Sequence, residues 1–302
     1  MINKDGLNQL LEDGLIKKID IFESVDSTNL RAKEDVRAWL EESSGDAWGR
    51  DKLPGLYISD NQTSGRGRLG RTWDTPPGET IAMSYIFRPE LGAEFISGVT
   101  LLASLAVTEA IVNLVNITRG GEAADGTLPV SIKWPNDIVI SGRKVCGILT
   151  ELVSPDIVIC GIGINVNNTA FPEELMDKAT SLFLETGKRW DMEALAGEVV
   201  RNMSGLVSEY EKEKSLGFVK EKYNNLLIHM NKEIYLFDND VSGSGDAASC
   251  DVNSCDTKGQ KKYICLGIDE TGALLAEDTT HTSEIKRIIS GEISVRGVYG
   301  YV

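Results

Sequence analysis

The sequence has few of the residues that bind metals or nucleic acids. Its 302 residues include only two histidines and five cysteines, and no two cysteine pairs have the spacing of a zinc site. Lysine and arginine number 31 against 46 aspartates and glutamates, so the net charge of −15 repels polyanions over the surface as a whole. These features disfavour a metalloprotein, a general nucleic-acid binder and a protein of anionic membranes.

The five cysteines fall into two groups. Cys146, Cys160 and Cys265 each lie inside an apolar, strand-like run, so we expect reduced thiols in the protein core. Cys250 and Cys255 lie in a polar stretch, where they are candidates for a redox pair or half of a metal site. No second cysteine pair with metal-ligand spacing completes such a site.

The sequence also lacks the apolar segments of secreted and membrane proteins. Residues 1–14 have no basic start followed by an apolar core, so no signal peptide is visible. The uncharged stretch around residues 95–108, in a predicted helix, is shorter than the roughly 18 residues that a membrane span requires. We therefore expect a cytoplasmic protein with no membrane partner.

The remaining composition is typical of a globular protein with two domains. Apolar residues make up 41% of the chain and charged residues 25%, and its length suggests two domains at roughly 150 residues each. Strand-like and helix-like stretches alternate through the first three quarters, which indicates an α/β layered domain. The pattern predicts a buried helix at residues 96–115, an amphipathic helix that begins after Asp191 and a turn at Ser141-Gly142. It also predicts strands at residues 56–59, 81–87, 130–134, 137–140, 145–151 and 157–166.

The pattern changes near residue 231 to short β-rich pieces separated by Gly and Asp turns. Strands predicted at residues 234–237, 263–268, 273–275, 285–289 and 293–298 are typical of a small antiparallel barrel. We therefore divide the chain into a large domain, residues 1–230, and a small barrel, residues 231–302. Three polar stretches, at residues 41–54, 119–127 and 238–260, are expected to be flexible insertions.

The most informative stretch is basic in an otherwise acidic protein. Residues 62–73 contain Arg66, Arg68 and Arg71 and no acidic residue. Guanidinium groups bind phosphate or carboxylate oxygens in pairs. Alternating glycines allow positive φ and bring backbone N–H groups close to an anion. The stretch predicts a loop that binds an anionic ligand.

Gly65, Gly67 and Gly70 also match the Gly-x-Gly-x-x-Gly pattern of dinucleotide-binding folds. That motif opens a helix, whereas residues 71–78 contain Pro76-Pro77 and lead into a strand. No acidic residue follows at about 20 residues in a βαβ unit. A flexible Arg-Gly tract that contacts nucleic acid, and a solvated loop, are the other interpretations of this stretch by itself.

A second group of polar residues surrounds a predicted corner between two strands. Pro135 interrupts strand pairing and holds Asn136 and Asp137 where an amide and a carboxylate can contact a ligand. Lys144 begins the next strand, from which its ammonium can reach a carboxylate or phosphate. Gly147 indicates close approach by a ligand or backbone. Considered singly, these residues also fit a plain turn and a surface lysine.

Two shorter motifs have equally simple structural explanations. Gly161 and Gly163 lie two apart on a predicted strand and remove side chains from one face, where a flat ligand or a neighbouring helix could lie. Ser27 or Thr28 precedes a helix, and the simplest role of such a residue is an N-cap.

Taken together and in order, five motifs resemble those of the biotin protein ligases. They are residues 26–29 (DSTN), 65–71 (GRGRLGR), 133–137 (KWPND), 142–149 (GRKVCGIL) and 161–165 (GIGIN). Residues 267–274 and 291–296 resemble the small SH3-like barrel of that family. The resemblance covers roughly residues 20–302 apart from the insertions. It implies an α+β or α/β fold of the biotin/lipoate ligase type, class II aminoacyl-tRNA synthetase-like, with a central mixed β-sheet flanked by helices and a C-terminal SH3-like β-barrel.

The resemblance also implies a two-step reaction in one site. Biotin and MgATP would give biotinyl-5'-adenylate and pyrophosphate, and a lysine of a biotin carboxyl carrier domain would then attack the mixed anhydride. Residues 1–230 would bind biotin and ATP, with Mg²⁺ as the ion and no metal ligand assigned. The partner is a biotin-dependent carboxylase, a homodimer is left open, and no nucleic acid is expected.

Site residues carried over from the family fall into three overlapping sets. Catalysis is assigned to Lys144, Arg66 and Arg68, with Lys144 binding the biotin carboxyl oxygen and the charge that develops at phosphorus. Ser27, Thr28 and Gln62 are expected to hydrogen-bond the ureido ring, and Asp137 to orient Lys133 and Asn136. The biotin set is Ser27, Thr28, Gln62, Gly65, Arg66, Trp73, Lys144, Gly147, Gly161 and Gly163; the nucleotide set is Arg66, Arg68, Arg71, Lys133, Asn136, Asp137, Asn165 and Arg296.

Two departures and two alternatives accompany this interpretation. Leu69 stands where some relatives carry another arginine. About 20 residues precede the first strand, too few for a three-helix DNA-binding domain, so no repressor role is expected. A lipoate or octanoate transferase would share the fold but is not expected to carry this arginine loop beside Lys-Trp-Pro-Asn-Asp. A nucleic-acid-binding regulator is disfavoured by the net charge of −15.

Overall fold

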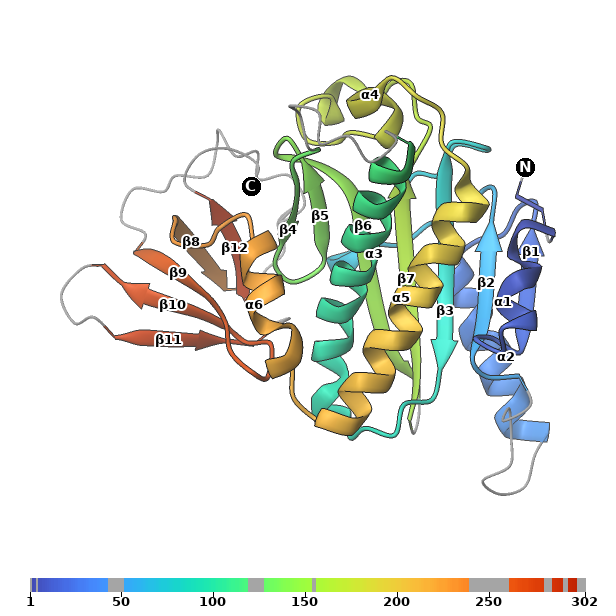
Figure 1. Cartoon of the computed structure of the whole chain (residues 1–302), viewed down its shortest axis with the longest axis horizontal. Helices are drawn as coiled ribbons and strands as arrows, with labels where there is room; N and C mark the ends of the chain where they lie inside the picture. The colour runs from blue at the N-terminus through green and yellow to red at the C-terminus, as the bar shows by residue number, and fades with distance from the viewer. Residues whose placement is uncertain are drawn as a thin grey trace.

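Two β-sheets organise the protein. The computed structural model describes residues 2–3, 5–42, 52–118, 128–153, 156–238, 261–279, 284–289 and 293–297. A seven-stranded sheet has the order β1-β2-β3-β7-β6-β5-β4, and a five-stranded sheet has the order β11-β10-β9-β8-β12 (Figure 1). We propose a domain boundary near residue 230, because the strands of the first sheet precede it and those of the second follow it.

The large sheet is mixed, as predicted. β1 and β2 pair in parallel, and the other neighbours in the sheet pair antiparallel. Ser141 and Gly142 have φ of 52° and 77° in the turn between β5 and β6, which confirms the predicted two-residue turn. The strands are β1 (Lys18–Phe22), β2 (Gly55–Ser59), β3 (Thr80–Phe87), β4 (Val130–Lys133), β5 (Asp137–Ile140), β6 (Arg143–Val153) and β7 (Ile157–Asn165).

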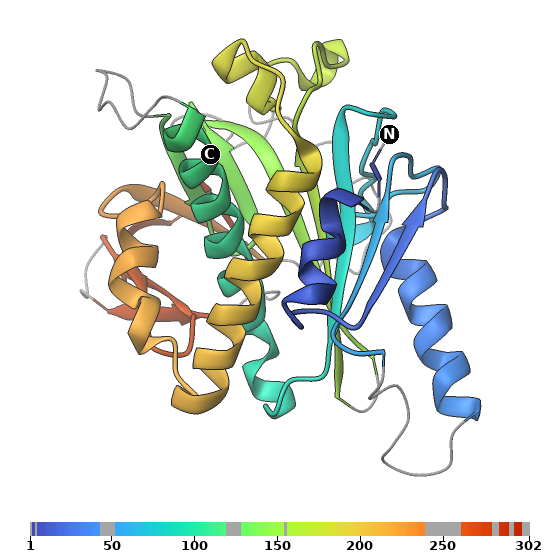
Figure 2. The ribbon, with the colours of Figure 1, turned by 45° about the vertical axis from the view of Figure 1, so that its right-hand side comes forward.

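Helices cover both faces of this sheet. α3 and α5 lie side by side across one face, and α2 packs against β2, β3 and β7 on the other (Figures 1 and 2). Asp191 caps α5 as predicted, because its carboxylate accepts a 2.9 Å hydrogen bond from the backbone N–H of Ala194. The α-helices are α1 (Asn8–Glu12), α2 (Thr28–Glu42), α3 (Ile96–Thr118), α4 (Leu182–Thr186), α5 (Met192–Glu213) and α6 (Gly217–Leu226); short 3₁₀ turns occur at Asp5–Leu7, Arg68–Gly70, Ala93–Phe95 and Glu173–Leu175.

Helix α3 extends beyond the uncharged stretch around residues 95–108. Its segment Ile96–Asn116 is long and apolar enough to cross a membrane by length and composition, so the inference that this region is too short for a membrane span was wrong. In the structure, however, 78% of its apolar window is buried inside the protein. Its hydroxyl side chains are satisfied locally, as when Ser104 donates to the Thr100 carbonyl at 3.0 Å. Helix α3 is therefore the central core helix.

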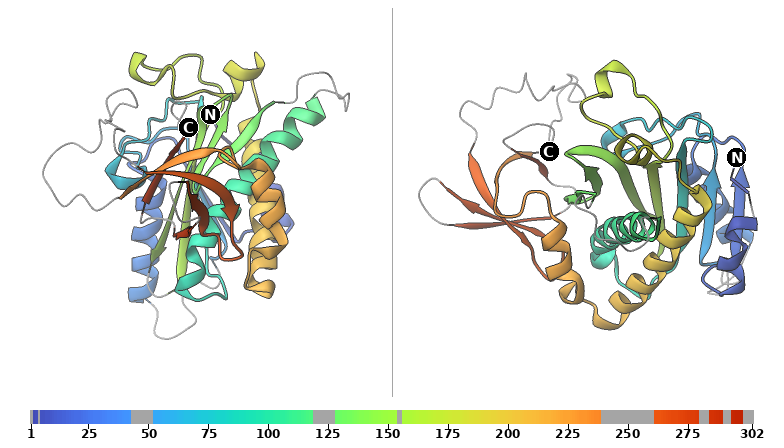
Figure 3. Two further views of the ribbon diagram at one scale, coloured as in Figure 1. Left: turned by 90° about the vertical axis from the view of Figure 1, so that its left-hand side faces the viewer. Right: turned by 45° about the horizontal axis from the view of Figure 1, so that its top comes forward.

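The C-terminal sheet lies next to the β4 edge of the large sheet. Helix α6 contacts both β4 and β9, and Figure 3 shows this arrangement from two further directions. Its strands are antiparallel, as predicted for a small barrel: β8 (Glu233–Asp238), β9 (Lys262–Ile268), β10 (Leu274–Asp278), β11 (Ile285–Ile288) and β12 (Ile293–Gly297). Cys146, Cys160 and Cys265 are free and buried, as expected. Most of the predicted insertions, together with Cys250 and Cys255, lie outside the described residues.

Candidate active site

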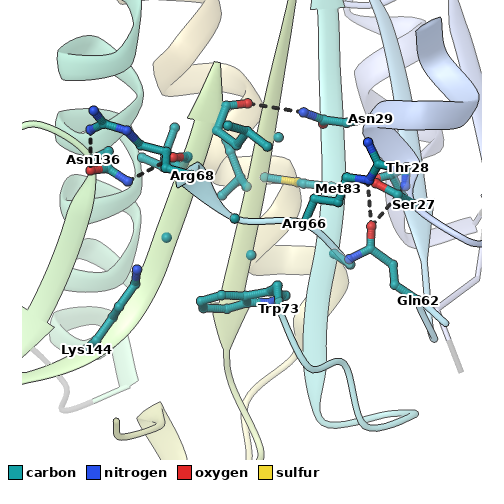
Figure 4. Close-up of a pocket in the computed structure, with 18 residues that line it drawn as sticks. Ser27, Thr28, Asn29, Gln62, Arg66, Arg68, Trp73, Met83, Asn136 and Lys144 are labelled. Atoms are coloured by element: carbon teal, nitrogen blue, oxygen red, sulfur yellow. Dashed lines mark hydrogen bonds between the residues drawn. The ribbon is translucent and has the colours of Figure 1, made fainter. Parts of the chain in front are cut away.

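One cavity brings together most of the residues that the motifs single out. It has a volume of about 50 Å³ and lies between the start of α2, the basic loop and strands β3, β6 and β7 (Figure 4). Its lining residues are Ser27, Thr28, Asn29, Gln62, Arg66, Gly67, Arg68, Trp73, Ala82, Met83, Asn136, Lys144, Gly147, Ile148, Leu149, Gly161, Ile162 and Gly163. The five motifs therefore meet at one place, although they are spread over most of the large sheet.

The floor of the cavity is a strip of sheet with few side chains. Ala82, Gly163 and Gly147 lie in register across β3, β7 and β6. Side chains of paired residues point to the same face of a sheet, so this row leaves a flat area of backbone. The next row places Ser84 beside Gly161 in the same way.

The strip is occupied by side chains of the protein itself. A Cβ added at Gly163 would overlap the indole of Trp73, and a Cβ at Gly147 would lie 3.2 Å from the same ring. A Cβ at Gly161 would overlap the amide of Asn29. Asn29 belongs to α2, so a neighbouring helix does lie against Gly161, whereas the indole of Trp73 lies against Gly163; a flat ligand on this strip stays a prediction. Because small-molecule pockets usually enclose roughly 300–1,000 Å³, the Trp73 side chain must shift before a ligand of that size can enter.

A polar network closes one end of the cavity. Gln62 accepts hydrogen bonds through Oε1 from the backbone N–H of Thr28 at 2.9 Å and from its hydroxyl at 3.3 Å. The hydroxyl of Ser84 donates to Thr28 Oγ1 at 2.7 Å and to Asn29 Oδ1 at 2.6 Å. Thr28 and Gln62, predicted together, are thus in direct contact, and Ser27 lies beside them, 2% exposed.

Asn29 is a lining residue to which no site role was assigned from the sequence. Its amide nitrogen donates to Glu151 Oε2 at 2.9 Å and to the Leu149 carbonyl at 3.2 Å. Glu151 in turn pairs with Lys33 at 2.5 Å. The available signal was its position directly after Ser27 and Thr28, at the start of a helix.

The basic loop folds back on itself in a narrow hairpin. The backbone N–H of Trp73 donates to the Gly65 carbonyl at 2.9 Å, and the backbone N–H of Gly67 donates to the Arg71 carbonyl at 2.8 Å. Only Gly70, at φ +74°, uses the left-handed conformation expected of these glycines. Gly65 is required for a different reason: a Cβ there would overlap the Trp73 carbonyl oxygen. Gly65 itself does not line the cavity.

Arg68 is the arginine of this loop with the most specific partner. Its Nη1 donates a 2.9 Å hydrogen bond to Asn136 Oδ1, which joins the basic loop to the corner between β4 and β5. Burial lowers the pKa of the Arg68 guanidinium; the Asp137 carboxylate opposes this effect and Arg71 adds to it. Arginine remains charged even so. Arg66 and Arg71 are both exposed, but only Arg66 lines the cavity.

Lys144 points toward the same cavity with a defined partner. Its Nζ lies 2.7 Å from Asp137 Oδ1 and 5.6 Å from the centroid of the Trp73 ring. Asp137 also lies opposite Lys133 in the β4–β5 register, so the expectation that it orients Lys133 and Asn136 stays a prediction. The β5–β6 register places Asp137 opposite Gly147, and its irregularity between Ile138 and Val139 lies between this pair and Lys144, which is opposite Val139.

Several predicted nucleotide contacts do not line the cavity. Asn165 is buried and donates to the Thr180 carbonyl at 3.2 Å, so it secures the segment that follows β7. Lys133 and Asp137 are likewise outside the cavity wall. The side chain of Arg296, in β12, lies outside the described residues. Within the part of the chain that the structure describes, no group of three His, Cys, Asp or Glu side chains is placed to hold a metal.

Comparisons with known sequences point to one family. Residues 22–167 match the family described as "Biotin/lipoate A/B protein ligase family". "Bifunctional ligase/repressor BirA" of Bacillus spizizenii is 36% identical over 247 residues, which is 80% of this chain and 66% of that protein. The protein of the same name from Escherichia coli is 27% identical over 302 residues, covering 98% of this chain and 78% of that protein. This chain thus spans 66% of the length of the Bacillus relative.

Solved structures give the same result over a greater share of the chain. A biotin protein ligase from Aquifex aeolicus, in complex with biotin and ATP, is 30% identical with a TM-score of 0.66. The match covers 93% of this chain and 99% of that one. The motifs, the mixed sheet and these similarities agree, and the chain belongs to the biotin protein ligase family.

Proposed function

We propose that this chain activates biotin with ATP and transfers it to a lysine of a biotin carboxyl carrier domain. The observation that carries the proposal is that Lys144, Arg66 and Arg68 share one cavity with the polar pair Thr28 and Gln62. One end of this cavity offers hydrogen bonds to a neutral polar ring, and the other offers positive charge to anions. Biotin has both a ureido ring and a carboxylate, and ATP supplies the phosphates.

In the first step, a biotin carboxylate oxygen attacks the α-phosphorus of ATP, and the bond from that phosphorus to the pyrophosphate oxygen breaks. Negative charge builds on the phosphoryl oxygens and on the leaving group. Lys144 and Arg68, each fixed by a partner at 2.7 and 2.9 Å, supply preorganised positive charge for this state. After Trp73 has shifted to admit the ligand, Trp73 and the basic loop exclude water from the anhydride.

In the second step, the amine of the acceptor lysine attacks the anhydride carbonyl, AMP leaves, and the nitrogen loses a proton. No covalent nucleophile of the enzyme is needed. The cysteines next to the strip are poorly suited to such a role, because burial raises the pKa of Cys160 to about 12 and that of Cys146 well above its usual range.

The remaining partners belong to the same proposal. Mg²⁺ accompanies ATP, since a triphosphate brings the ion with it and offers it phosphate oxygens. The acceptor is the carrier domain of a carboxylase, because relatives from Mycobacterium tuberculosis and Paracoccus denitrificans are described as "Biotin--[acetyl-CoA-carboxylase] ligase". A cytoplasmic location fits a reaction that consumes ATP. Whether the protein forms a homodimer is left open.

A lipoate ligase is the competing function, because the matched family includes lipoate enzymes. The two differ in the group at the far end of the acid: biotin presents a ureido ring, whereas lipoate presents an apolar dithiolane. Three hydrogen-bonding side chains at that end, Thr28, Gln62 and Asn29, favour biotin. Incorporation of labelled biotin and labelled lipoate into carrier domains separates the two.

The decisive test is biotin-dependent exchange of pyrophosphate into ATP by the purified protein. We expect Lys144→Ala to slow exchange by about 100-fold or more, because a charged group is lost from the reacting centre. Arg143→Ala is the matched control: its guanidinium pairs with Glu185 at 2.7 Å, and it does not line the cavity. Near-normal exchange in Lys144→Ala would contradict the assignment, and no exchange in the wild type would contradict the proposed function.

A further inference from the structure

The turn between β9 and β10, residues 269–273, reaches from the C-terminal sheet to the corner between β4 and β5. The indole Nε1 of Trp134 donates a 3.1 Å hydrogen bond to the carbonyl oxygen of Gly272 in a buried position. Trp134 is 3% exposed. A buried indole N–H requires an acceptor, and here the acceptor belongs to the other sheet. Trp134 therefore connects the two sheets directly.

This turn fits its place with little freedom. A Cβ at Gly272 would lie 2.9 Å from Leu216 and 3.0 Å from Leu101, and Gly272 has φ of +87°. The backbone N–H of Leu216 also donates to the Glu270 carbonyl at 2.7 Å. The turn is thus held between α3 and the start of α6, and Gly272 cannot move relative to Trp134 without repacking both helices.

The turn is also rigid within itself. Asp269 Oδ1 accepts hydrogen bonds from the backbone N–H groups of Thr271 at 2.8 Å and Ala273 at 3.1 Å. Arg287 Nε donates to Asp269 Oδ2 at 2.6 Å. Burial by itself would raise the pKa of the Asp269 carboxyl, but its hydrogen bonds have the larger combined effect, and the net result is a lowered pKa. The Gly272 carbonyl oxygen, which accepts the Trp134 hydrogen bond, therefore belongs to a rigid turn.

From Trp134 the contacts continue to the cavity in two residues. The Ser104 hydroxyl shares its proton between the Thr100 carbonyl at 3.0 Å and the Pro135 carbonyl at 3.2 Å. Asn136 donates from its side-chain Nδ2 to the Ile148 carbonyl at 3.0 Å, and its backbone carbonyl accepts from the Ile148 N–H at 2.9 Å. The remaining polar atom of that side chain, Oδ1, accepts from Arg68 at 2.9 Å. The position of the corner between β4 and β5 therefore determines where the Asn136 side chain lies.

We propose that Trp134 is a positioning residue, through which the C-terminal sheet holds Asn136 and, by way of Asn136, holds Arg68 at the nucleotide end of the cavity. The inference rests on the proposed function in one respect, that Arg68 and Asn136 face ATP. Trp134 itself does not line the cavity. Its effect is therefore on the affinity for ATP and on the order of the basic loop, with biotin binding left largely unchanged.

The test compares two tryptophan variants by steady-state kinetics of pyrophosphate exchange. Trp134→Phe removes the indole N–H and keeps an aromatic ring in the core. Trp190→Phe is the matched control, since Trp190 is 9% exposed and its Nε1 donates at 2.9 Å to Thr186, away from the cavity. We expect Trp134→Phe to raise the KM for ATP by about fivefold to tenfold, with the KM for biotin and kcat within about twofold of wild type. Trp190→Phe leaves all three unchanged.

Hydrogen exchange on the free protein gives a readout that does not depend on activity. We expect amides of residues 65–73 to exchange at least about fivefold faster in Trp134→Phe than in wild type or Trp190→Phe. Ser104→Ala, which removes the hydroxyl that contacts Pro135, should also speed hydrogen exchange in residues 65–73. It replaces Trp134→Phe in this test if that variant does not fold. In an Asn136→Ala background, Trp134→Phe should cause no further rise in the KM for ATP.

Three outcomes overturn the inference. The first is an unchanged rate of amide hydrogen exchange in residues 65–73 of Trp134→Phe. The second is an equal rise in the KM for ATP and the KM for biotin. The third is an additive effect of Trp134→Phe and Asn136→Ala on the KM for ATP. A wild-type protein without biotin-dependent exchange activity contradicts the proposed function instead, and the hydrogen-exchange comparison still decides the role of Trp134.

Discussion

Arg68 and Arg71 are three residues apart in the basic loop, yet the structure gives them different surroundings. Arg68 is partly buried, lines the cavity and donates to Asn136. Arg71 is exposed and contributes its backbone carbonyl to the loop hairpin. The sequence assigned both to the nucleotide, because a guanidinium has the same chemistry wherever it lies. Only their positions distinguish them.

We therefore expect the two arginines to differ in their effect on ATP. Arg68→Ala should raise the KM for ATP by roughly 10-fold to 100-fold, since a charged hydrogen bond contributes about 1.5–3 kcal/mol. Arg71→Ala should raise it by less than about threefold, because an exposed charge is screened by solvent. Exchange kinetics at varied ATP measure both. Equal effects of the two variants would show that the loop rearranges when ATP binds.

Residue identities were easier to predict than residue partners. The motifs correctly selected Lys144, Gln62 and Gly163 as residues of one cavity. The sequence did not reveal that Asp137 pairs with Lys144, or that the Trp73 indole lies on the glycine strip. Such pairings depend on sheet register and on how a loop folds back, and neither is encoded in the local pattern of one segment.

At the scale of elements, the shape of the basic loop depends on Gly65 more than on its neighbour Gly67. A Cβ at Gly65 would overlap the backbone oxygen of Trp73, which cannot yield without opening the loop. A Cβ at Gly67 would lie 3.5 Å from the Arg71 carbonyl oxygen, an ordinary contact. The two glycines lie two residues apart in the same motif, which makes them a matched pair.

Gly65→Ala should reduce biotin-dependent exchange by at least about tenfold, because the Gly65–Trp73 hydrogen bond that closes the loop is lost. Gly67→Ala should cause a clearly smaller loss. Thermal unfolding of both variants checks that the core is intact, since the loop lies outside it. A larger loss for Gly67→Ala than for Gly65→Ala would show that the loop closes differently from the structure described here.

Elements with a strong periodic pattern were predicted well, and elements held by tertiary contacts were not. The strand Asp137–Ile140 has the predicted bounds, and α5 begins where Asp191 predicted. Helix α6, Gly217–Leu226, was not predicted, because only Val219 and Tyr223 are buried in it and its start has no side-chain cap. Its stability comes from contacts with β4 and β9, which are distant in sequence.

At the scale of the whole molecule, the two sheets also meet at a buried histidine. His229 follows α6 and is 3% exposed, and its Nε2 has no hydrogen-bond partner among the described residues. The adjacent Ile228 N–H donates to the Ile132 carbonyl of β4 at 3.0 Å. Burial, with Lys133 and Lys232 nearby, lowers the pKa of His229 to about 4. The junction therefore favours the neutral imidazole over the charged one.

This histidine should make the protein less stable in acid. The unfolded chain binds a proton on His229 below about pH 6.5, whereas the folded protein does so only near pH 4. Above pH 6.5 both states are neutral and the effect vanishes. As the pH falls from 6.5 to 4, the unfolded state binds more protons, and the free energy of unfolding decreases by about 3 kcal/mol from this group.

His229→Gln removes the titration and keeps a polar side chain of similar length. Urea unfolding of wild type and variant between pH 7.5 and pH 4 isolates the group, because carboxylates titrate equally in both. The difference in unfolding free energy between the two proteins should be constant above pH 7 and then shift in favour of the variant by up to about 1.4 kcal/mol per pH unit. Parallel curves across the whole range would mean that the junction opens in the folded protein and lets His229 take up its proton at an ordinary pH.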